Sequence, residues 1–326
     1  MTLADVGLSD RVLAQVASSA KRDAKLARIT RVDRGAVVVH DDDGERVVSV
    51  AKSMAQRTPP AIGDWALVDV GRGALAELLP RWSALVRRAA GRREVSQVVA
   101  ANIDLVLVLI GLDGDFNLRR LDRYLALVGD SGARPYVLLT KAGLVADADA
   151  KVAEVRAHCP GIDVAAVDVV LGVNADLPRA LVPPGTTAAL VGSSGVGKST
   201  LVNHLLGATV AATRAVRDRD DRGVHTTSRR ELFRVEGGGV VIDTPGMREL
   251  GMSRETSLDE AFPEIVHEAL SCKFTDCRHA TEAGCAVKRA IAEGRIEARR
   301  LASFEALRLE QTERSSSARD AIRRKR

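Results

Sequence analysis

The sequence predicts a multidomain α/β protein, and three observations support this fold class. Short β-rich runs alternate with turn residues between 28 and 70, which is typical of a small barrel. From about residue 89, long apolar runs alternate with segments of helical periodicity, which is typical of a three-layer α/β domain. After about residue 252 the chain becomes mainly helical and carries clustered cysteines. We therefore expect domains at 1–88, 89–251 and 252–312, and a basic tail at 313–326.

Composition limits the classes of protein to consider. The chain has 326 residues, and 46% of them are hydrophobic, which is enough to fill several cores. No run of 18 apolar residues occurs, and the start MTLADVGLSD lacks the basic region of a secretory signal. We therefore expect a cytoplasmic protein without a membrane partner, and a monomer as the default.

Charge and aromatic content bear on a nucleic-acid partner. The net charge of +5 and the pI of about 9.2 fit a partner rich in phosphate, although solvated lysines and arginines explain them equally well. Aromatic residues make up only 3% of the chain, which disfavours a platform of stacked bases. If RNA binds, we expect phosphate contacts and shape to dominate.

The first predicted element is a barrel between Arg28 and Val70. Its strands are expected in AVVVH, RVVSV and GDWALVDV, with the turn DDDG and the breaker TPP between them. This spacing favours an OB-type barrel, and the alternative is a β-rich cap with no ligand of its own.

The α/β domain is expected to begin with IDLVLVLIGL, a run so apolar that it predicts a parallel strand covered on both faces. The next segment, NLRRLDRYLALVGD, predicts a helix with Leu118, Leu121, Leu125 and Val128 on one face and Gly129 as its stop. YVLL, a helical stretch near 146–158, IDVAAV and TAALV continue the alternation.

A phosphate-binding loop follows the run TAALV. The segment GSSGVGKS matches G-x-x-x-x-G-K-[ST] between a predicted strand and the helical run STLVNHLLG. Its glycines let backbone N–H groups surround phosphates, Lys198 reaches the β and γ phosphates, and Ser199 supplies a hydroxyl to magnesium. The expected nucleotide-binding residues here are Gly192, Ser193, Ser194, Gly195, Val196, Gly197, Lys198, Ser199 and Thr200.

Two further segments fit a nucleotide with magnesium. In VVIDTPGMREL, Asp243 ends an apolar strand and Gly246 follows three residues later, which matches D-x-x-G. We expect Asp243 to hold magnesium mainly through water and the Gly246 N–H to contact the γ phosphate. Between the two motifs lies RDRDDRGVHTTSRREL, in which Thr226 or Thr227 would complete the magnesium shell with Ser199. An ordinary surface loop is the alternative.

The segment YVLLTKAGLV resembles a base-recognition loop that comes before the phosphate-binding loop instead of after it. Thr140, Lys141, Ala142 and Gly143 occupy the four positions of the guanine-binding pattern Asn-Lys-x-Asp, and we expect them to bind nucleotide. The order of motifs is the usual GTPase order cut after D-x-x-G and rejoined at the old ends. Such a permutation is tolerated because the parts meet in space.

The cysteine-rich segment CKFTDCRHATEAGC has the spacing C-x4-C-x-H-x5-C. Cys272, Cys277, His279 and Cys285 would supply three thiolates and one imidazole, a closed tetrahedral set for structural zinc. Free thiols are the alternative. The remaining cysteine, Cys159, is expected to be a buried thiol.

Together these motifs closely resemble the RsgA family of circularly permuted ribosome-biogenesis GTPases. The matching segments are GDWALVD, AANIDLVLVL, FNLRRLDRYL, LVGSSGVGKSTLVN, RGVHTTSRREL, DTPGMREL and CRHATEAGCAVKRAI. The resemblance implies an N-terminal OB-fold, a permuted P-loop GTPase domain and a C-terminal zinc-binding domain. It also implies binding to the small (30S) ribosomal subunit and its rRNA late in maturation, with hydrolysis of GTP to GDP stimulated by that subunit.

The resemblance also suggests a catalytic group. Met247 stands where many small GTPases have a water-orienting Gln, and a Met side chain cannot orient water. His225 matches the family's RHTT pattern and is our candidate for that role, with Lys198 and Thr227 as the other expected catalytic residues.

Two departures from the family pattern affect recognition of the base. Gly143 stands at the position of the carboxylate, and Asp168 and Val169 stand where the second base loop usually carries Ser-Ala. We hypothesise that Asp168 supplies the carboxylate that Gly143 lacks, with a solvated loop acid as the alternative. Asp147 is another possible donor, but it is expected to begin the next helix.

These departures leave other functions open. One is a nucleotide-bound ribosome assembly factor with relaxed purine specificity or negligible hydrolysis. Another is an RNA-binding zinc protein in which nucleotide only stabilises the fold. The basic residues Lys288, Arg289, Arg295, Arg299 and Arg300 would contact phosphate in that protein or form a solvated helix face.

Overall fold

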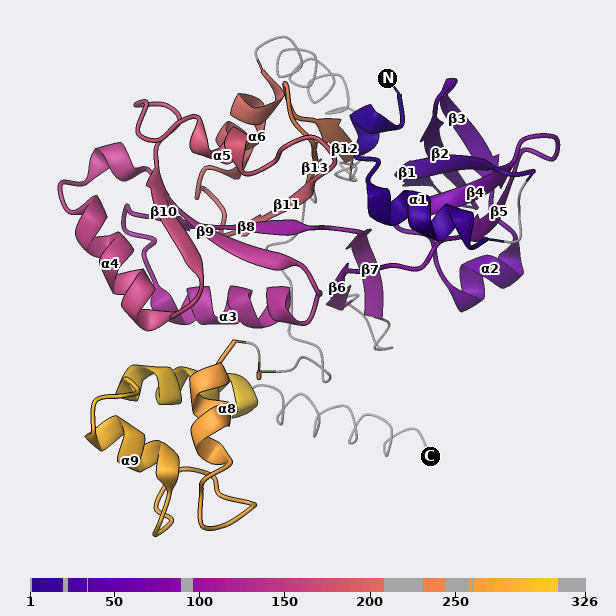
Figure 1. Ribbon diagram of the computed structural model, residues 1–326. Helices are drawn as coiled ribbons and strands as arrows, with labels where there is room; N and C mark the ends of the chain where they lie inside the picture. Colours follow the sequence, from indigo (N-terminus) through magenta and orange to yellow (C-terminus); the bar gives the residue numbers. More distant parts are fainter. Residues whose placement is uncertain are drawn as a thin grey trace, which may run out of the picture.

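The computed structural model describes residues 2–19, 23–33, 35–88, 96–207, 231–243, 258–259 and 261–309. A barrel, a layered α/β domain and a helical C-terminal region follow one another along the chain (Figure 1), which confirms the predicted fold class. Within the described part of the chain, every helix is too short or too polar to span a lipid bilayer.

The barrel is closed and has the strand order β1-β2-β3-β5-β4. Its strands are β1 (Lys25–Asp33), β2 (Ala36–Asp41), β3 (Gly44–Ser49), β4 (Trp65–Asp69) and β5 (Ala74–Leu78). Small and β-branched side chains fill its interior, among them Ile29, Val39 and Val68. Three short helices accompany the strands: η1 (Ala4–Val6), α1 (Asp10–Ala17) and α2 (Lys52–Arg57).

A buried arginine joins the barrel to the α/β domain. The Arg28 guanidinium donates to Thr187 Oγ1 at 2.8 Å and to the Val6 carbonyl, and it stacks on the Trp65 ring with 5.1 Å between Cζ and the ring centroid. Burial lowers the pKa of Arg28 to about 10, so the side chain is still charged at neutral pH. The N-terminal segment, the barrel and the sheet therefore meet at one cation.

The α/β domain contains a six-stranded sheet with the order β10-β9-β8-β11-β13-β12. In that order the strands are β10 (Asp163–Val167), β9 (Arg134–Thr140), β8 (Leu105–Gly111), β11 (Thr187–Gly192), β13 (Val240–Asp243) and β12 (Glu231–Arg234). Only β12 runs antiparallel, paired with β13. A separate hairpin of β6 (Ala84–Arg88) and β7 (Ser96–Ala101) spans the boundary that we place at 88/89.

Helices cover both faces of the sheet (Figure 1). Helices α3 (Leu118–Gly129) and α4 (Ala148–His158) lie on one face, where Val106, Val108 and Ile110 of β8 point. Helices α5 (Leu177–Ala180) and α6 (Lys198–Leu206) lie on the other, where Leu105, Leu107 and Leu109 point. The run IDLVLVLIGL is thus apolar throughout because both of its faces are buried.

The C-terminal region contains α8 (Pro263–Ala269), α9 (Ala286–Ala292) and a helix at 298–309. The rings of Phe262 and Phe304 pack edge to face in its core, with 5.5 Å between centroids.

Arg300 holds this region against the α/β domain. Its guanidinium donates to Asp122 Oδ1 at 2.5 Å, Glu264 Oε1 at 2.7 Å and the Ala261 carbonyl at 2.6 Å. The prediction that Arg300 lies on a solvated or phosphate-binding face is therefore wrong, because the side chain is buried and paired with carboxylates. Periodicity alone did not distinguish this arginine from its exposed neighbours.

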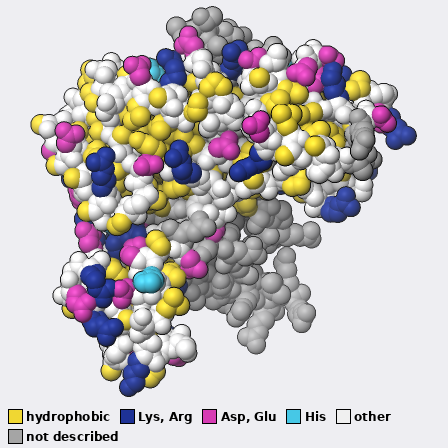
Figure 2. Space-filling view, in the orientation of Figure 1, with side chains coloured by type: hydrophobic (Ala, Val, Ile, Leu, Met, Phe, Trp, Pro, Cys, Tyr) yellow, Lys and Arg dark blue, Asp and Glu magenta, His cyan; other side chains and the backbone are white. Residues whose placement is uncertain are grey.

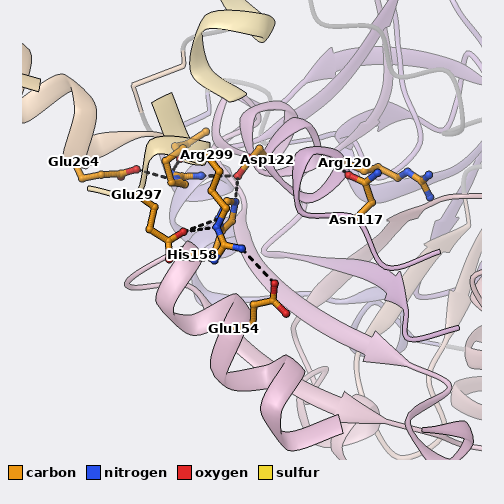
Figure 3. Close-up of polar contacts among 10 residues, drawn as sticks. Asn117, Arg120, Asp122, Glu154, His158, Glu264, Glu297 and Arg299 are labelled. Atoms are coloured by element: carbon orange, nitrogen blue, oxygen red, sulfur yellow. Dashed lines mark hydrogen bonds and ion pairs between the residues drawn. The ribbon is translucent and has the colours of Figure 1, made fainter. Parts of the chain in front are cut away.

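Two other contacts surround this ion pair (Figure 3). His158 Nε2 lies 2.8 Å from Asp122 Oδ1, and His158 Nδ1 lies 3.6 Å from Glu297. Cys159, next to His158, is buried as predicted, and burial raises the pKa of its thiol to about 12. A thiol with that pKa is an inert packing group at neutral pH.

We expect Arg300→Met to destabilise the protein strongly, because it leaves the buried Asp122 and the neighbouring Glu264 without their cation. Breaking a buried pair from one side costs about 3–5 kcal/mol. The matched control is Arg299→Met, because Arg299 is a half-exposed neighbour whose pairs with Glu154 and Glu297 contribute about 0–1 kcal/mol. Urea unfolding followed by circular dichroism measures both variants, and equal losses of stability would contradict the proposed role of Arg300.

Candidate functional site

The phosphate-binding loop lies between the end of β11 and the start of α6. Gly195 and Gly197 have φ values of +76° and +102°, which other residues rarely adopt. A Cβ on Gly192 would lie 2.8 Å from the Leu109 carbonyl oxygen of the neighbouring strand. The glycines of the motif are thus required by backbone conformation and by close packing on β8.

Lys198 is the first residue of α6, and its side chain folds back over the loop. Its Nζ donates to the Gly192 carbonyl at 2.6 Å and to the Ser193 carbonyl. A helix N-terminus and an ammonium group at one loop form an anion site with the chemistry that phosphate requires.

The segment after β9 is tied to the phosphate-binding loop. Thr140 Oγ1 donates to the Val196 carbonyl at 2.6 Å. Lys141 has a left-handed backbone with φ of +62°, and its ammonium pairs with Asp113. The two predicted loops therefore meet, although 56 residues separate Thr140 from Val196.

Asp168 follows β10 and contacts Gly143. Its Oδ2 accepts the Gly143 N–H at 3.2 Å, and its Oδ1 accepts the N–H groups of Val170 and Leu171, both at 3.0 Å. The side chain is buried, so it is not the solvated loop acid of the alternative interpretation. Asp147 precedes the first residue of α4, as expected.

A cavity of about 310 Å³ lies between these loops. It is lined by Thr140, Lys141, Leu144, Val167, Asp168, Val169, Val170, Leu171, Gly195, Val196, Gly197, Thr200 and Leu201. Both predicted base loops and the phosphate-binding loop contribute to it, so one cavity adjoins the residues expected to bind the base and those expected to bind the phosphates.

The structure describes only some of the other predicted site residues. The backbone of β13 pairs with β11, Ile242 opposite Ala189, which brings the position of Asp243 to the end of the sheet where the phosphate-binding loop begins. His225, Thr226, Thr227 and Gly246 lie outside the described residues.

Two acidic residues of the site were not predicted. Asp113 pairs with Lys141, and Asp115 accepts a hydrogen bond from Ser193 Oγ and pairs with Arg120 of α3. Burial acts to raise the pKa of Asp115, but Ser193 and Arg120 hold it below its usual value. The available signal was GLDGDFN, two acids just after a buried parallel strand, where α/β proteins place their sites.

The cysteine cluster in the C-terminal region is a candidate metal site, separate from the nucleotide loops. Cys272, Cys277, His279 and Cys285 offer ligand atoms that all lie within 4.8 Å of one another. His279 Nδ1 lies 3.4 Å from Cys285 Sγ and 3.7 Å from Cys272 Sγ, and these two sulfurs are 4.0 Å apart. The bond lengths of tetrahedral zinc place its ligands about 3.4–3.8 Å apart, so a small contraction of the cluster would bring all four atoms to one ion. Burial, with the charge of Arg308, lowers the pKa of His279 and favours the neutral ligand form.

A second group of potential ligands, Asp122, His158 and Cys159, is less suited to a metal. The Arg300 guanidinium already neutralises Asp122 there, and its positive charge would repel a metal ion.

Residues 78–253 match the RsgA GTPase family model. The small ribosomal subunit biogenesis GTPase RsgA of Xylella fastidiosa (strain 9a5c) is 47% identical over 251 residues, which cover 76% of this chain and 72% of that protein. The protein of the same name from Opitutus terrae is 39% identical, with 95% of this chain and 90% of that protein covered.

Two solved structures share the fold. YjeQ from Thermotoga maritima gives a TM-score of 0.68 at 22% identity and covers 88% of this chain and 98% of that chain. YloQ, described as a circularly permuted GTPase, gives a TM-score of 0.64 at 23% identity and covers 90% and 97%. These two likenesses show the fold of the chain.

We expect Cys272→Ser to abolish the binding of one metal ion per chain and to lower the stability of the C-terminal region, because three ligands hold a metal less tightly than four. Cys159→Ser is the matched control, since Cys159 is a buried cysteine outside the cluster. Elemental analysis of both purified variants measures the metal content. Equal metal content in Cys272→Ser and the unchanged protein would remove Cys272 from the site.

Proposed function

The chain belongs to the RsgA GTPase family and is therefore a GTP hydrolase, and we propose that it acts in late maturation of the small ribosomal subunit. Its relatives are named small ribosomal subunit biogenesis GTPases. The subunit and its rRNA are the proposed partners, the cytoplasm is the proposed compartment and a monomer is the proposed state. The domain boundaries 1–88, 89–251 and 252–312 belong to the same proposal.

The observation that carries the proposal is the meeting of the separate motifs at one edge of the sheet. The loops after β9, β10 and β11 line one cavity, and the backbone of β13 ends beside β11. A base and a polyphosphate joined in one ligand require that arrangement. The hydrogen bond from Thr140 to the Val196 carbonyl couples the base loop to the phosphate-binding loop.

Within this site we assign roles to individual residues. Lys198 would neutralise the β and γ phosphates from the start of α6. Ser199, Asp243 and Thr226 or Thr227 would hold magnesium, which supplies charge neutralisation to the phosphates when bound. Gly246 would contact the γ phosphate. His225 would orient the attacking water, because Met247 offers no polar group for it.

The C-terminal metal site is proposed to bind one structural zinc ion. Four protein ligands leave no open position for a substrate, so its role is to hold the loop 272–285 and α9 in place. Lys and Arg side chains are exposed on this region (Figure 2), among them Lys288, Arg289, Arg295 and Arg299. Arg295 pairs with Glu268 and Glu293, and Arg299 pairs with Glu154 and Glu297, so we assign phosphate contacts with rRNA to Lys288 and Arg289.

We expect GTP hydrolysis to be slow for the protein alone and faster with small ribosomal subunits. The measurement is phosphate release from GTP with magnesium, with small subunits, with large subunits as the control, and without either. Tight GTP binding without any stimulated hydrolysis would favour instead the nucleotide-bound assembly factor.

We expect His225→Ala to lower subunit-stimulated hydrolysis by about 10²–10⁴-fold, the usual contribution of one positioned polar group, while GTP affinity changes little. His267→Ala is the control, because His267 is exposed on α8, away from the nucleotide. Single-turnover hydrolysis with small subunits and equilibrium GTP binding separate the two effects. Equal stimulated rates in His225→Ala and the parent protein would exclude His225 from catalysis.

A further inference from the structure

We propose that Asp168 recognises guanine in this protein, from the loop after β10, and takes the place of the carboxylate that the family pattern puts at position 143. This inference rests on the proposed function, because it assigns the base specificity of the same nucleotide site. Positions 143 and 168 would then be coupled, because a side chain at position 143 would collide with Asp168.

Packing around Gly143 gives the first argument. A Cβ built on Gly143 would lie 3.2 Å from Asp168 Oδ2, 2.9 Å from Leu171 Cβ and 2.6 Å from Leu171 Cδ1. The Asp168 carboxylate and Leu171 thus fill the space that a side chain at position 143 would enter. An aspartate at 143 would also bring two carboxylates together, which repel each other.

Hydrogen bonds fix the Asp168 carboxylate in place. It accepts three backbone N–H groups, from Gly143, Val170 and Leu171. The loop itself is closed by a bridge between Asp168 and Val173, with N–H···O distances of 2.7 and 2.9 Å. A carboxylate has about four acceptor positions, so one position on Oδ2 is left for a donor on a ligand.

The surroundings of the carboxylate suit a purine ring. Asp168 contributes to the lining of the cavity, together with the apolar side chains of Leu144, Val170 and Leu171. These three are 64%, 75% and 56% exposed, which is unusual for large apolar residues and leaves them available to cover the faces of a flat ring.

Guanine is the purine whose edge fits a carboxylate. Its N1–H and exocyclic N2–H groups are both donors, and an ionised carboxylate is an acceptor only. In the orientation assumed for guanine, adenine would face the carboxylate with an acceptor at N1 and no amino group at C2, so the buried acceptor would be unpaired. A site built to accept a donor rejects an analogue that lacks it.

Asp168→Asn tests whether this carboxylate selects guanine. Xanthine differs from guanine by a carbonyl oxygen in place of the 2-amino group, and an asparagine amide can donate to that oxygen. We expect the parent protein to bind GDP more tightly than xanthosine diphosphate. In Asp168→Asn we expect the ratio of the two affinities to fall by at least about tenfold.

Equilibrium titration with magnesium measures both affinities in each variant. Both nucleotides carry the same diphosphate, so a change in phosphate binding or in the fraction of folded protein affects both affinities equally and cancels in their ratio. Asp147→Asn is the matched control, because Asp147 is also an acidic residue at the end of a loop, before α4, and lies outside the cavity lining. We expect it to keep the parent's preference for GDP.

A second variant tests the coupling of the pair. Gly143→Asp, which restores the family residue, is expected to weaken GDP binding in the presence of Asp168, because the new side chain meets Leu171 and a like charge. Stronger GDP binding by Gly143→Asp would overturn the coupling.

The other outcomes separate this inference from the proposed function. A parent protein that prefers GDP, with an unchanged ratio in Asp168→Asn, overturns the role of Asp168 and leaves the GTPase assignment intact. Equal affinity of the parent for GDP, ADP and xanthosine diphosphate also overturns it and indicates relaxed purine specificity. A parent that binds no purine nucleotide refutes both the proposed function and this inference.

Discussion

The parallel pairing of β10, β9, β8, β11 and β13 is the constraint on which the site depends. In a parallel sheet the carboxyl ends of all strands meet at one edge, whatever the order in which the chain visits them. The base loops after β9 and β10 therefore meet the phosphate-binding loop after β11, although they come before it in the sequence. A chain that is cut and rejoined elsewhere keeps the same site, because the pairing of the strands, and not their order in the sequence, brings the loops together.

Buried arginines position the two accessory regions on this sheet. Arg28 joins the barrel to Thr187 at the start of β11, and Arg300 joins the C-terminal helices to Asp122 on α3. Each cation is desolvated and surrounded by several acceptors, so removing either one leaves polar groups without partners. The first turn of α3 is also linked to the phosphate-binding loop through Asp115, which pairs with Arg120 and accepts a hydrogen bond from Ser193. One helix is thus connected to both the nucleotide loop and the C-terminal region.

Features that depend on local spacing were predictable from the sequence. Short segments contain the glycines and Lys198 of the phosphate-binding loop, the alternating strands of the barrel and the four clustered cysteine and histidine residues. The residue types in each segment indicate its geometry directly. Features that depend on pairing across long distances were not predictable. Arginine is usually found on the surface, and Arg300 is buried because Asp122 of α3 meets it beside Glu264 and Ala261. The hydrogen bond between Asp168 and Gly143 joins residues 25 positions apart, and the sequence suggested it only through a missing carboxylate.

A crystal structure of the protein with GDP and magnesium would show which atoms contact the guanine edge. We expect the base in the cavity beside Leu144 and Leu171, with guanine N1 or N2 within about 3.2 Å of Asp168 Oδ2. A guanine edge that faces solvent or other residues, with the Asp168 carboxylate still bound only to backbone N–H groups, would contradict this expectation.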